Sequence, residues 1–318
     1  MSTLVSVGMT TIMNNPRQTE FKKFSWYNLT DNQDSEIRFL RDHFNFSKAH
    51  LADVAAPPLR PKVEFADDYT FIVLLYPIYN RKTGIVKVTE IDFFANKKFI
   101  ITVHKNEINT IKDFSQKMQS EPYMREKYSN QNSIYFLLDI LEEMNLALYP
   151  MLNHIAWDID NIDSQLFTDH ERELVQNILS VKRNIVAIRK SMSTYKNVLE
   201  DLCDNSKEYF GAKEDKRFNR IINSSKDIWM QLETNKATID AIQESNESTI
   251  TFRLNDIMKT LTIFSVIVFP LTLLAAIFGM NTTAGMPFMG NFGFWKVMAI
   301  MVVGVGFMFG FFKKNKWI

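Results

Sequence analysis

A stripe of mostly polar and small side chains follows one face of the most apolar segment of the chain. Its members recur every three or four residues, the spacing of positions along one side of an α-helix. The stripe consists of Asn255, Met258, Leu261, Thr262, Ser265, Phe269, Thr272, Ala276 and Gly279. Several copies of such a helix around a pore would turn this stripe inward. Small and hydroxylated residues are also the usual contact between paired helices in lipid, so both interpretations stay open.

Other side chains offer little catalytic chemistry. The apolar segments contain no charge, which argues against a proton relay or a voltage sensor. The histidines show no metal-ligand spacing, and the chain has neither a phosphate loop nor a nucleophile elbow. We therefore predict that the chain is not an enzyme, has no organic cofactor and binds no nucleic acid, and that its histidines are structural or surface groups. These are His43, His50, His104, His154 and His170.

Two apolar segments near the C-terminus have the composition of membrane spans. Residues 261–278 and 297–312 are uncharged, and the second is extended by residues 292–295. With their flanks, both reach the roughly 20 residues that a helix needs to cross about 30 Å of hydrocarbon. The lysines that follow Phe312 predict a cytoplasmic C-terminus by the positive-inside rule. We therefore expect a multi-pass protein of the cell membrane, or inner membrane, with both termini cytoplasmic and residues 281–291 outside.

Charge is segregated in the same way. No Asp or Glu follows Asp256, and five lysines do, which leaves 32 of the 37 basic residues and all 36 acidic residues to positions 1–256. That part carries a net charge of −4, whereas the whole chain carries +1. The single Cys203 excludes an intramolecular disulfide and a Cys-rich zinc site, and fits a reducing compartment. No signal peptide is visible in residues 1–17.

The soluble part divides into two patterns. Residues 21 to about 115 alternate β-rich runs with helical stretches, which predicts a mixed α/β domain with hairpin turns at 80–84 and 96–98. From about Ser129, Pro and Gly nearly vanish and apolar residues recur at helical spacing, which predicts long helices. The last helix, from about Lys213, has no breaker before the membrane. At roughly 65 residues and 100 Å, it needs flanking helices or other copies to pack against.

The acids Asp158, Asp160 and Asp163 could bind cations but are more typical of a solvated helix face.

A triplet at the outer end of the first span carries a family resemblance. Gly279-Met280-Asn281 is followed by a short loop, a second span and the basic tail 313–317. This arrangement resembles the CorA family of divalent metal ion (magnesium and cobalt) transporters, and residues 253–281 resemble that family's first membrane helix. Residues 26–30, 59–65 and 182–184 also resemble family segments, so the resemblance covers nearly the whole chain.

The resemblance implies a fold and an assembly. It predicts a funnel-shaped homopentamer, each chain having a cytoplasmic α/β/α sandwich, long helices and two C-terminal transmembrane helices. The predicted divisions are an α/β domain at 1–128, long cytoplasmic helices at 129–256, a pore helix at 257–280, an outer loop at 281–291, a second transmembrane helix at 292–312 and a basic tail at 313–318.

The resemblance also implies roles for individual residues. Gly279, Met280 and Asn281 would form the outer selectivity ring, where neutral amides and carbonyls hold hydrated Mg²⁺ by its waters, since this ion dehydrates reluctantly. Met258 and Leu261 would make an apolar gate that closes by dewetting, with Asn255 at its cytoplasmic mouth and Thr272 further along the pore. Lys313, Lys314 and Lys316 would form a basic collar at the inner mouth, unless they serve only as a topology signal.

Regulation in this family uses Mg²⁺ held between neighbouring cytoplasmic domains. Asp53 matches one of its carboxylates, although it could also be a plain surface acid. Counting back from Asn255 to the position of its partner reaches Arg220, not an acid, and Asp227 lies one or two turns away. Either the correspondence with the family shifts by a few residues in this helix, or this protein has an altered Mg²⁺ sensor.

The outer loop also departs from the family. Residues 286–288 read Met-Pro-Phe where members often have Met-Pro-Glu, so cations are attracted to the mouth less strongly. The sequence therefore predicts channel-like, potential-driven uptake of Mg²⁺, with Co²⁺ or Ni²⁺ as further candidates, gated by cytoplasmic Mg²⁺. Zinc-transporting relatives usually carry Gly-Ile-Asn, which argues mildly against Zn²⁺ transport. A Zn²⁺ transporter and a non-conducting, membrane-anchored sensor or scaffold remain alternatives.

Overall fold

The computed structural model describes residues 17–30, 34–57, 60–166, 171–210, 216–280, 287 and 292–317. The chain forms two compact units, Met1–Ile242 and Gln243–Ile318. The first contains a sheet and most of the helices, and the second contains the two most apolar helical segments.

Six strands of the first unit form one mixed sheet. They are β1 (Arg17–Glu20), β2 (Ser25–Leu29), β3 (Lys62–Phe65), β4 (Thr70–Asn80), β5 (Ile85–Ala95) and β6 (Phe99–His104). The spatial order is β1-β2-β6-β5-β4-β3; β2 and β6 pair in parallel, and the other neighbouring pairs are antiparallel. Both predicted hairpin turns are confirmed, between β4 and β5 and between β5 and β6. Gly84 has a φ of 66°, which a residue without a Cβ adopts at no steric cost.

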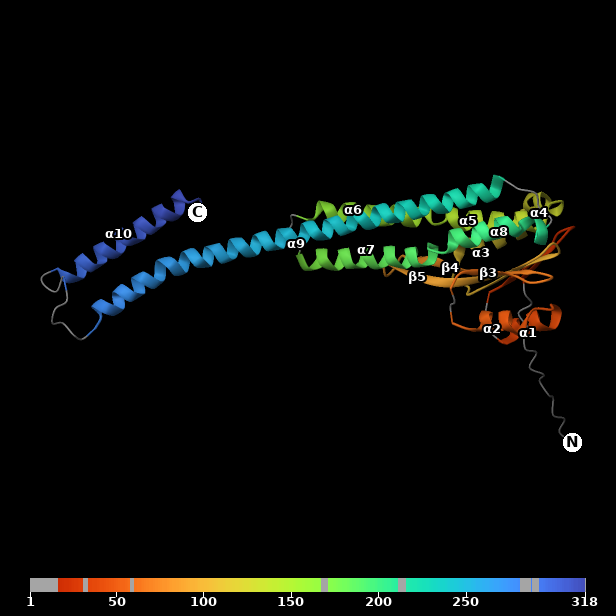
Figure 1. Ribbon diagram of the computed structural model, residues 1–318, viewed down its shortest axis with the longest axis horizontal. Helices are drawn as coiled ribbons and strands as arrows, with labels where there is room; N and C mark the ends of the chain where they lie inside the picture. Colours follow the sequence, from red (N-terminus) through yellow and green to blue (C-terminus); the bar gives the residue numbers. More distant parts are fainter. Residues whose placement is uncertain are drawn as a thin grey trace, which may run out of the picture. The chain divides into compact units, whose positions relative to one another are not determined.

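Helices cover both faces of this sheet (Figure 1). On one face lie α1 (Asp34–His43) and α2 (Lys48–Ala55), which enclose a core that includes Leu40, Phe71 and Phe94. The opposite core is larger and joins Trp26 and Phe93 to the remaining helices of this unit. Those helices are α3 (Asn109–Ser120), α4 (Pro122–Ser129), α5 (Ser133–Leu146), α6 (Tyr149–Ser164), α7 (Glu171–Met192) and α8 (Tyr195–Phe210). The predicted α/β/α sandwich followed by long helices is confirmed.

The longest helix, α9 (Lys216–Phe278), has 63 residues and begins three residues after the predicted start. Up to Ile242 it buries a regular apolar face against the larger core, including Phe218, Ile228 and Ile239. Flanking helices of the same chain therefore supply the packing that this part of the rod requires.

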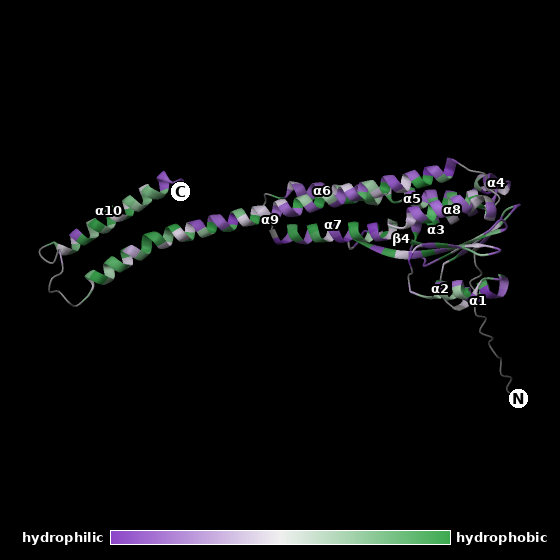
Figure 2. Ribbon diagram, viewed as in Figure 1, coloured by the Kyte–Doolittle hydropathy of each residue, from purple (hydrophilic) through white to green (hydrophobic). Residues whose placement is uncertain are grey.

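The second unit contains the rest of α9 and α10 (Gly293–Lys314), both strongly apolar (Figure 2). Both helices are long and apolar enough to span a membrane, and the most apolar 18-residue stretch of each is not buried within the chain. Exposed side chains there include Phe264, Phe269, Val303 and Phe307. Such a surface is stable in lipid rather than in water, as the sequence predicts.

Candidate functional site

The polar stripe of α9 lies on the face opposite α10. Apart from half-buried Ser265, the stripe is exposed. The half-buried positions of this segment cluster on another face, which includes Lys259, Ile263, Ile267, Leu271, Leu274 and Phe278. Lys259 Nζ donates a hydrogen bond of 3.3 Å to the Lys316 carbonyl, so this second face is turned toward α10. At 100° per residue, the centres of the two faces are roughly 175° apart.

The hydroxyl groups of the stripe are satisfied by their own helix. Thr262 donates to the Met258 carbonyl at 2.7 Å, Ser265 to the Leu261 carbonyl at 2.8 Å and Thr272 to the Val268 carbonyl at 2.9 Å. Each hydroxyl oxygen keeps lone pairs that can accept a hydrogen bond from water. The hydroxyl groups of the stripe can thus bind water on the side of α9 that faces away from α10. The stripe does not form the contact between α9 and α10 of one chain.

The triplet begins where α9 ends. The Gly279 amide donates to the Ala275 carbonyl at 2.9 Å, and the Met280 amide donates to the Ile277 carbonyl at 3.3 Å. A Cβ at position 279 would lie 3.0 Å from the Ala275 oxygen, which is tighter than ordinary packing allows. A side chain at this position would require a small shift of that carbonyl. Asn281 and the predicted loop other than Pro287 lie outside the described residues.

At the other end of the second unit, the predicted collar lysines lie close to one another along the chain. Lys313 and Lys314 end α10, and Lys316 follows in a left-handed conformation with a φ of 56°. The Trp317 ring stacks on Phe312 with 5.7 Å between centroids, and its amide donates to the Phe312 carbonyl. The contact from Lys259 adds a fourth lysine, which the sequence analysis did not place in the collar. Its signal was available, because it is the last charge before the first span.

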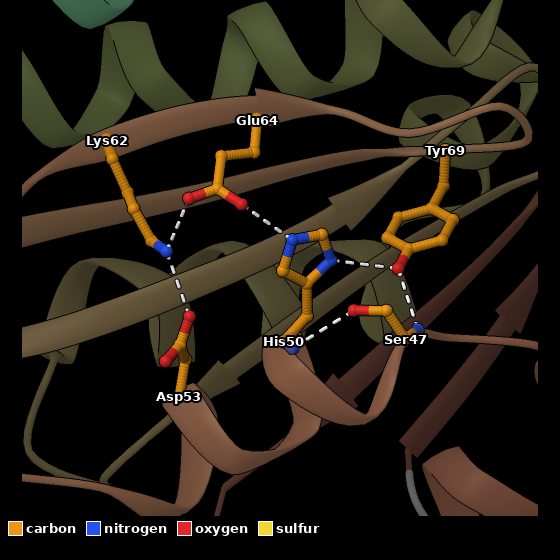
Figure 3. Close-up of polar contacts among 6 residues, drawn as sticks. All are labelled: Ser47, His50, Asp53, Lys62, Glu64 and Tyr69. Atoms are coloured by element: carbon orange, nitrogen blue, oxygen red, sulfur yellow. Dashed lines mark hydrogen bonds and ion pairs between the residues drawn. The ribbon is translucent and has the colours of Figure 1, made fainter.

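Asp53, the predicted regulatory ligand, belongs to a polar network under α2 (Figure 3). Its Oδ2 accepts a hydrogen bond of 2.8 Å from Lys62 Nζ, which also donates to Glu64 Oε1 at 2.6 Å. Glu64 Oε2 lies 2.7 Å from Nε2 of buried His50. The sequence analysis did not place Lys62, Glu64 or His50 at this site, and their only signal was proximity to Asp53 along the chain.

Hydrogen-bonding capacity assigns the protons of this network. The Tyr69 hydroxyl accepts a hydrogen bond from the Ser47 amide at 2.9 Å and lies 2.8 Å from His50 Nδ1. The hydroxyl proton can therefore go to Nδ1, which leaves Nε2–H to donate to the Glu64 carboxylate. The His50 ring also stacks on Phe71. His50 is thus a structural group, as predicted, and it orients Glu64.

The ionisation of the network favours charged Lys62 and Glu64. Burial lowers the pKa of the Lys62 ammonium, but hydrogen bonds from it to Asp53 and Glu64 outweigh this effect and raise the pKa above its ordinary value. Hydrogen bonds from Lys62 and His50 lower the pKa of Glu64. Asp53 is therefore paired with a cationic side chain of its own chain, and a metal ion at Asp53 must compete with that ammonium.

The position predicted for the partner of Asp53 is engaged elsewhere. Arg220 on α9 forms an ion pair of 3.0 Å with Glu142 on α5, and Asp227 is exposed one to two turns later. Of the three acids on α6, Asp160 and Asp163 are exposed, as expected of a solvated face. Asp158 is half-buried beside His154, and its burial raises its pKa.

The remaining described histidines have structural contacts. His104 Nε2 lies 3.0 Å from Asn28 Oδ1, His154 Nε2 lies 2.7 Å from the Tyr79 hydroxyl, and His43 Nδ1 lies 3.0 Å from the Phe39 carbonyl. His170 is outside the described residues. Within the described part of the chain, no group of three or more His, Cys, Asp or Glu side chains is arranged to hold a metal ion.

Comparison with known proteins agrees with this architecture. Residues 21–314 match the family described as CorA-like Mg²⁺ transporter protein. The cobalt/magnesium transport protein CorA of Thermotoga maritima is 25% identical over 295 residues, which cover 92% of this chain and 83% of that protein. A zinc transport protein, ZntB of Pectobacterium carotovorum, is 19% identical over 93% of this chain and 89% of its own length. The structure of the CorA magnesium transporter from Methanocaldococcus jannaschii superposes with a TM-score of 0.79 at 22% identity, covering 93% of this chain and 92% of that one.

The chain is therefore a membrane transport protein with an α/β/α domain, two candidate membrane helices and no enzymatic role. It belongs to the CorA-like family of metal ion transporters, as the Gly-Met-Asn triplet and the segments around it predicted.

Proposed function

We propose that this protein is a homopentameric, channel-like importer of Mg²⁺, in which five copies of α9 turn the stripe toward a shared pore. The observation that carries the proposal is the orientation of the stripe. It is exposed, lies opposite α10 and leads to Gly279 and Met280 at the end of the helix. Membership of the transporter family supports the same assembly.

The proposed filter is the ring of Gly279, Met280 and Asn281. Mg²⁺ binds water strongly, so a ring of neutral amides and carbonyls can select the hydrated ion without stripping it. Further in, Met258 and Leu261 would form the apolar gate, Asn255 its cytoplasmic mouth and Thr272 a polar point in the pore. The exposed fractions of Met258 and Leu261 are 59% and 56% in the single chain, so both are available to line a space between copies.

Phe269 also points outward on the stripe, with 71% of its surface exposed. A ring of five phenyl groups would be tight, so the direction in which Phe269 points within the assembly is the least certain of the stripe positions. The lysines 259, 313, 314 and 316 would form the collar at the inner mouth. Their positive charge would lower the local concentration of cations at this mouth.

The driving force needs no nucleotide. A divalent ion gains about 4.6 kcal/mol on moving through a potential of about 100 mV, inside negative. We propose a cell-membrane or inner-membrane location with both termini cytoplasmic, where this potential drives influx. Cytoplasmic Mg²⁺ would close the pore by binding at Asp53 between neighbouring copies and displacing the Lys62 ammonium.

One alternative keeps the pore but changes the ion. A zinc transport protein among the relatives and the acid-free outer loop both favour a test of Zn²⁺. The other alternative is a membrane-anchored sensor or scaffold whose helices associate without conducting.

The test is ion uptake by liposomes that contain the purified protein, measured with Mg²⁺- and Zn²⁺-sensitive dyes under an inside-negative potential. We expect Mg²⁺ influx that grows with voltage and disappears in Asn281→Ala, whereas Asn153→Ala, an exposed position on α6, keeps the full flux. Equal fluxes in both variants and in the wild type would exclude the filter. Absence of any flux would favour the scaffold, and Zn²⁺ influx that follows a pH gradient would favour the zinc carrier.

A further inference from the structure

The first unit contains a buried carboxyl group, that of Asp92, with an oxygen atom that lacks a hydrogen-bond donor among the described residues. Asp92 lies on β5 between Ile91 and Phe93, and only 4% of its surface is exposed. Among the described residues, none donates a hydrogen bond to its Oδ1. Buried polar atoms without a partner are rare because desolvation is costly, so such an atom calls for an unseen ligand or a functional role.

Asp92 lines a cavity of about 130 Å³ beneath the end of α2. The cavity is enclosed by Val54, Ala56 and Pro57 on one side and by residues of β5 and the end of β6 on the other. About 10–15 Å³ of such space holds one water molecule, so this cavity has room for several water-sized groups. It is large enough for an ion with part of its water shell and too small for an organic ligand of ordinary size.

Two of the three lysines near this cavity, Lys62 and Lys87, are engaged with other acids. The strand register puts Lys62 in the same row as Asp92, with Val73 between them. Lys62 Nζ binds Asp53 and Glu64, and Lys87 Nζ lies 3.0 Å from both Glu107 oxygens. The charged or titratable groups around Asp92 are Glu90 and Lys87 on β5, Asp53 on α2, Lys62 on β3, His104 on β6 and Lys105 after it.

Burial and nearby acids dominate the electrostatic surroundings of Asp92. Burial raises the pKa of the Asp92 carboxyl well above its ordinary value, and the nearby carboxylates of Glu90 and Asp53 raise it further, while Lys62 opposes them. The end of α2 adds the negative pole of a helix on the same side of the cavity. Apart from Lys62, these groups favour a positive ion in the space lined by Asp92 and Glu90.

We propose that this cavity is a binding site for a divalent cation, held by the carboxylates of Asp92 and Glu90, with water completing its coordination. Mg²⁺ is usually bound through one or two carboxylates and keeps several waters, so a site without a third acidic ligand suits this ion and its spectroscopic substitute Mn²⁺. The site lies within a single chain. It is separate from the pore and from the proposed ion at Asp53, and its existence does not depend on transport.

The experiment counts Mn²⁺ ions bound to the purified full-length protein in detergent, from the electron paramagnetic resonance signal of free Mn²⁺. We expect Asp92→Asn to bind one ion fewer per chain than the wild type, and Glu90→Gln to bind this ion more weakly. Asp160→Asn, an exposed acid on α6, serves as the matched control and keeps the wild-type number. Far-ultraviolet circular dichroism checks that each variant is folded, and Glu90→Gln carries the test if Asp92→Asn is not.

Asp53→Asn distinguishes the two carboxylate sites. The proposal expects it to retain the ion that Asp92→Asn loses, and the double variant to show both losses together. An unchanged ion count in both Asp92→Asn and Glu90→Gln would overturn the proposal. Loss of only one ion in the double variant would also overturn it, because Asp53 and Asp92 would then belong to one site.

Discussion

Polar side chains in the two units are satisfied in different ways. In the first unit they bond across the fold: Trp26 Nε1 donates to Thr102, and the Asn184 side chain binds the β4–β5 hairpin. In the second unit the hydroxyls of Thr262 and Thr272 bond to carbonyls four residues back on their own helix. A domain that encloses its polar groups can fold as one chain. A helix that turns its polar stripe away from its own neighbour leaves that stripe to meet water, lipid or other copies.

The largest expected effect is in the enclosed core of the first unit. Trp26 is fully buried, so Trp26→Ala should lower the free energy of unfolding by about 3–5 kcal/mol, through lost burial and the cavity left behind. Urea unfolding of the full-length protein followed by circular dichroism measures it. Trp157→Ala is the control, because Trp157 is 59% exposed and should change stability by less than about 0.5 kcal/mol. Equal effects at both positions would contradict the assignment of the core.

A smaller loss is expected at the hairpin. Asn184 Oδ1 accepts a hydrogen bond from the Val86 amide at 2.9 Å, and its Nδ2 donates to the Gly84 carbonyl at 2.7 Å. Asn184→Ala leaves the buried Val86 amide unpaired and should cost about 1–3 kcal/mol of stability. Asn177→Ala, exposed two turns earlier on α7, should have little effect in the same urea titration. A matching loss at Asn177 would mean that the hairpin contact contributes nothing.

Acid should weaken the network under α2. The pKa of Glu64 is below its ordinary value of 4.5 in the folded protein, so the stability it contributes is present above that value and disappears as the pH falls through the folded pKa. Glu64→Gln should therefore flatten the decline of the thermal midpoint in this acid range, whereas exposed Glu126→Gln should keep the wild-type slope. An unaltered pH profile in Glu64→Gln would show that Lys62 and His50 do not stabilise its charge.

The smallest effect on stability is expected on the stripe, with the flux as the informative readout. Thr272→Val keeps the side-chain shape and removes a hydroxyl bonded only to its own helix, so the unfolding free energy should change by about 0.5 kcal/mol or less. Under the proposed function, Mg²⁺ flux into liposomes should fall, because a polar point in the pore is lost. Thr260 makes the same bond off the stripe, and Thr260→Val should conduct normally. Identical fluxes in both variants would place Thr272 outside the pore.

Local sequence patterns predicted the longer strands and helices because each of these elements has a regular spacing of apolar residues or lacks helix breakers. Alternation over residues 85–95 corresponds to β5, and the breaker-free run from about 213 corresponds to α9. Short elements with weak patterns were not predicted, among them α2 and β3, although together they carry Asp53 and Lys62. Their positions depend on packing against the sheet, which no local repeat records.

By itself, the sequence determined the two spans, the sandwich, the family and the spacing of the stripe, since hydropathy, periodicity and the Gly-Met-Asn triplet are all local. The tertiary structure alone decided which way the stripe faces, that Lys62 engages Asp53, and that Asp92 is buried beside a cavity. Asp92 looks like any acid in an alternating strand until α2 covers it. Side-chain partners and burial depend on segments that are brought together by folding, and their free energies are set by that shared environment rather than by neighbours in the chain.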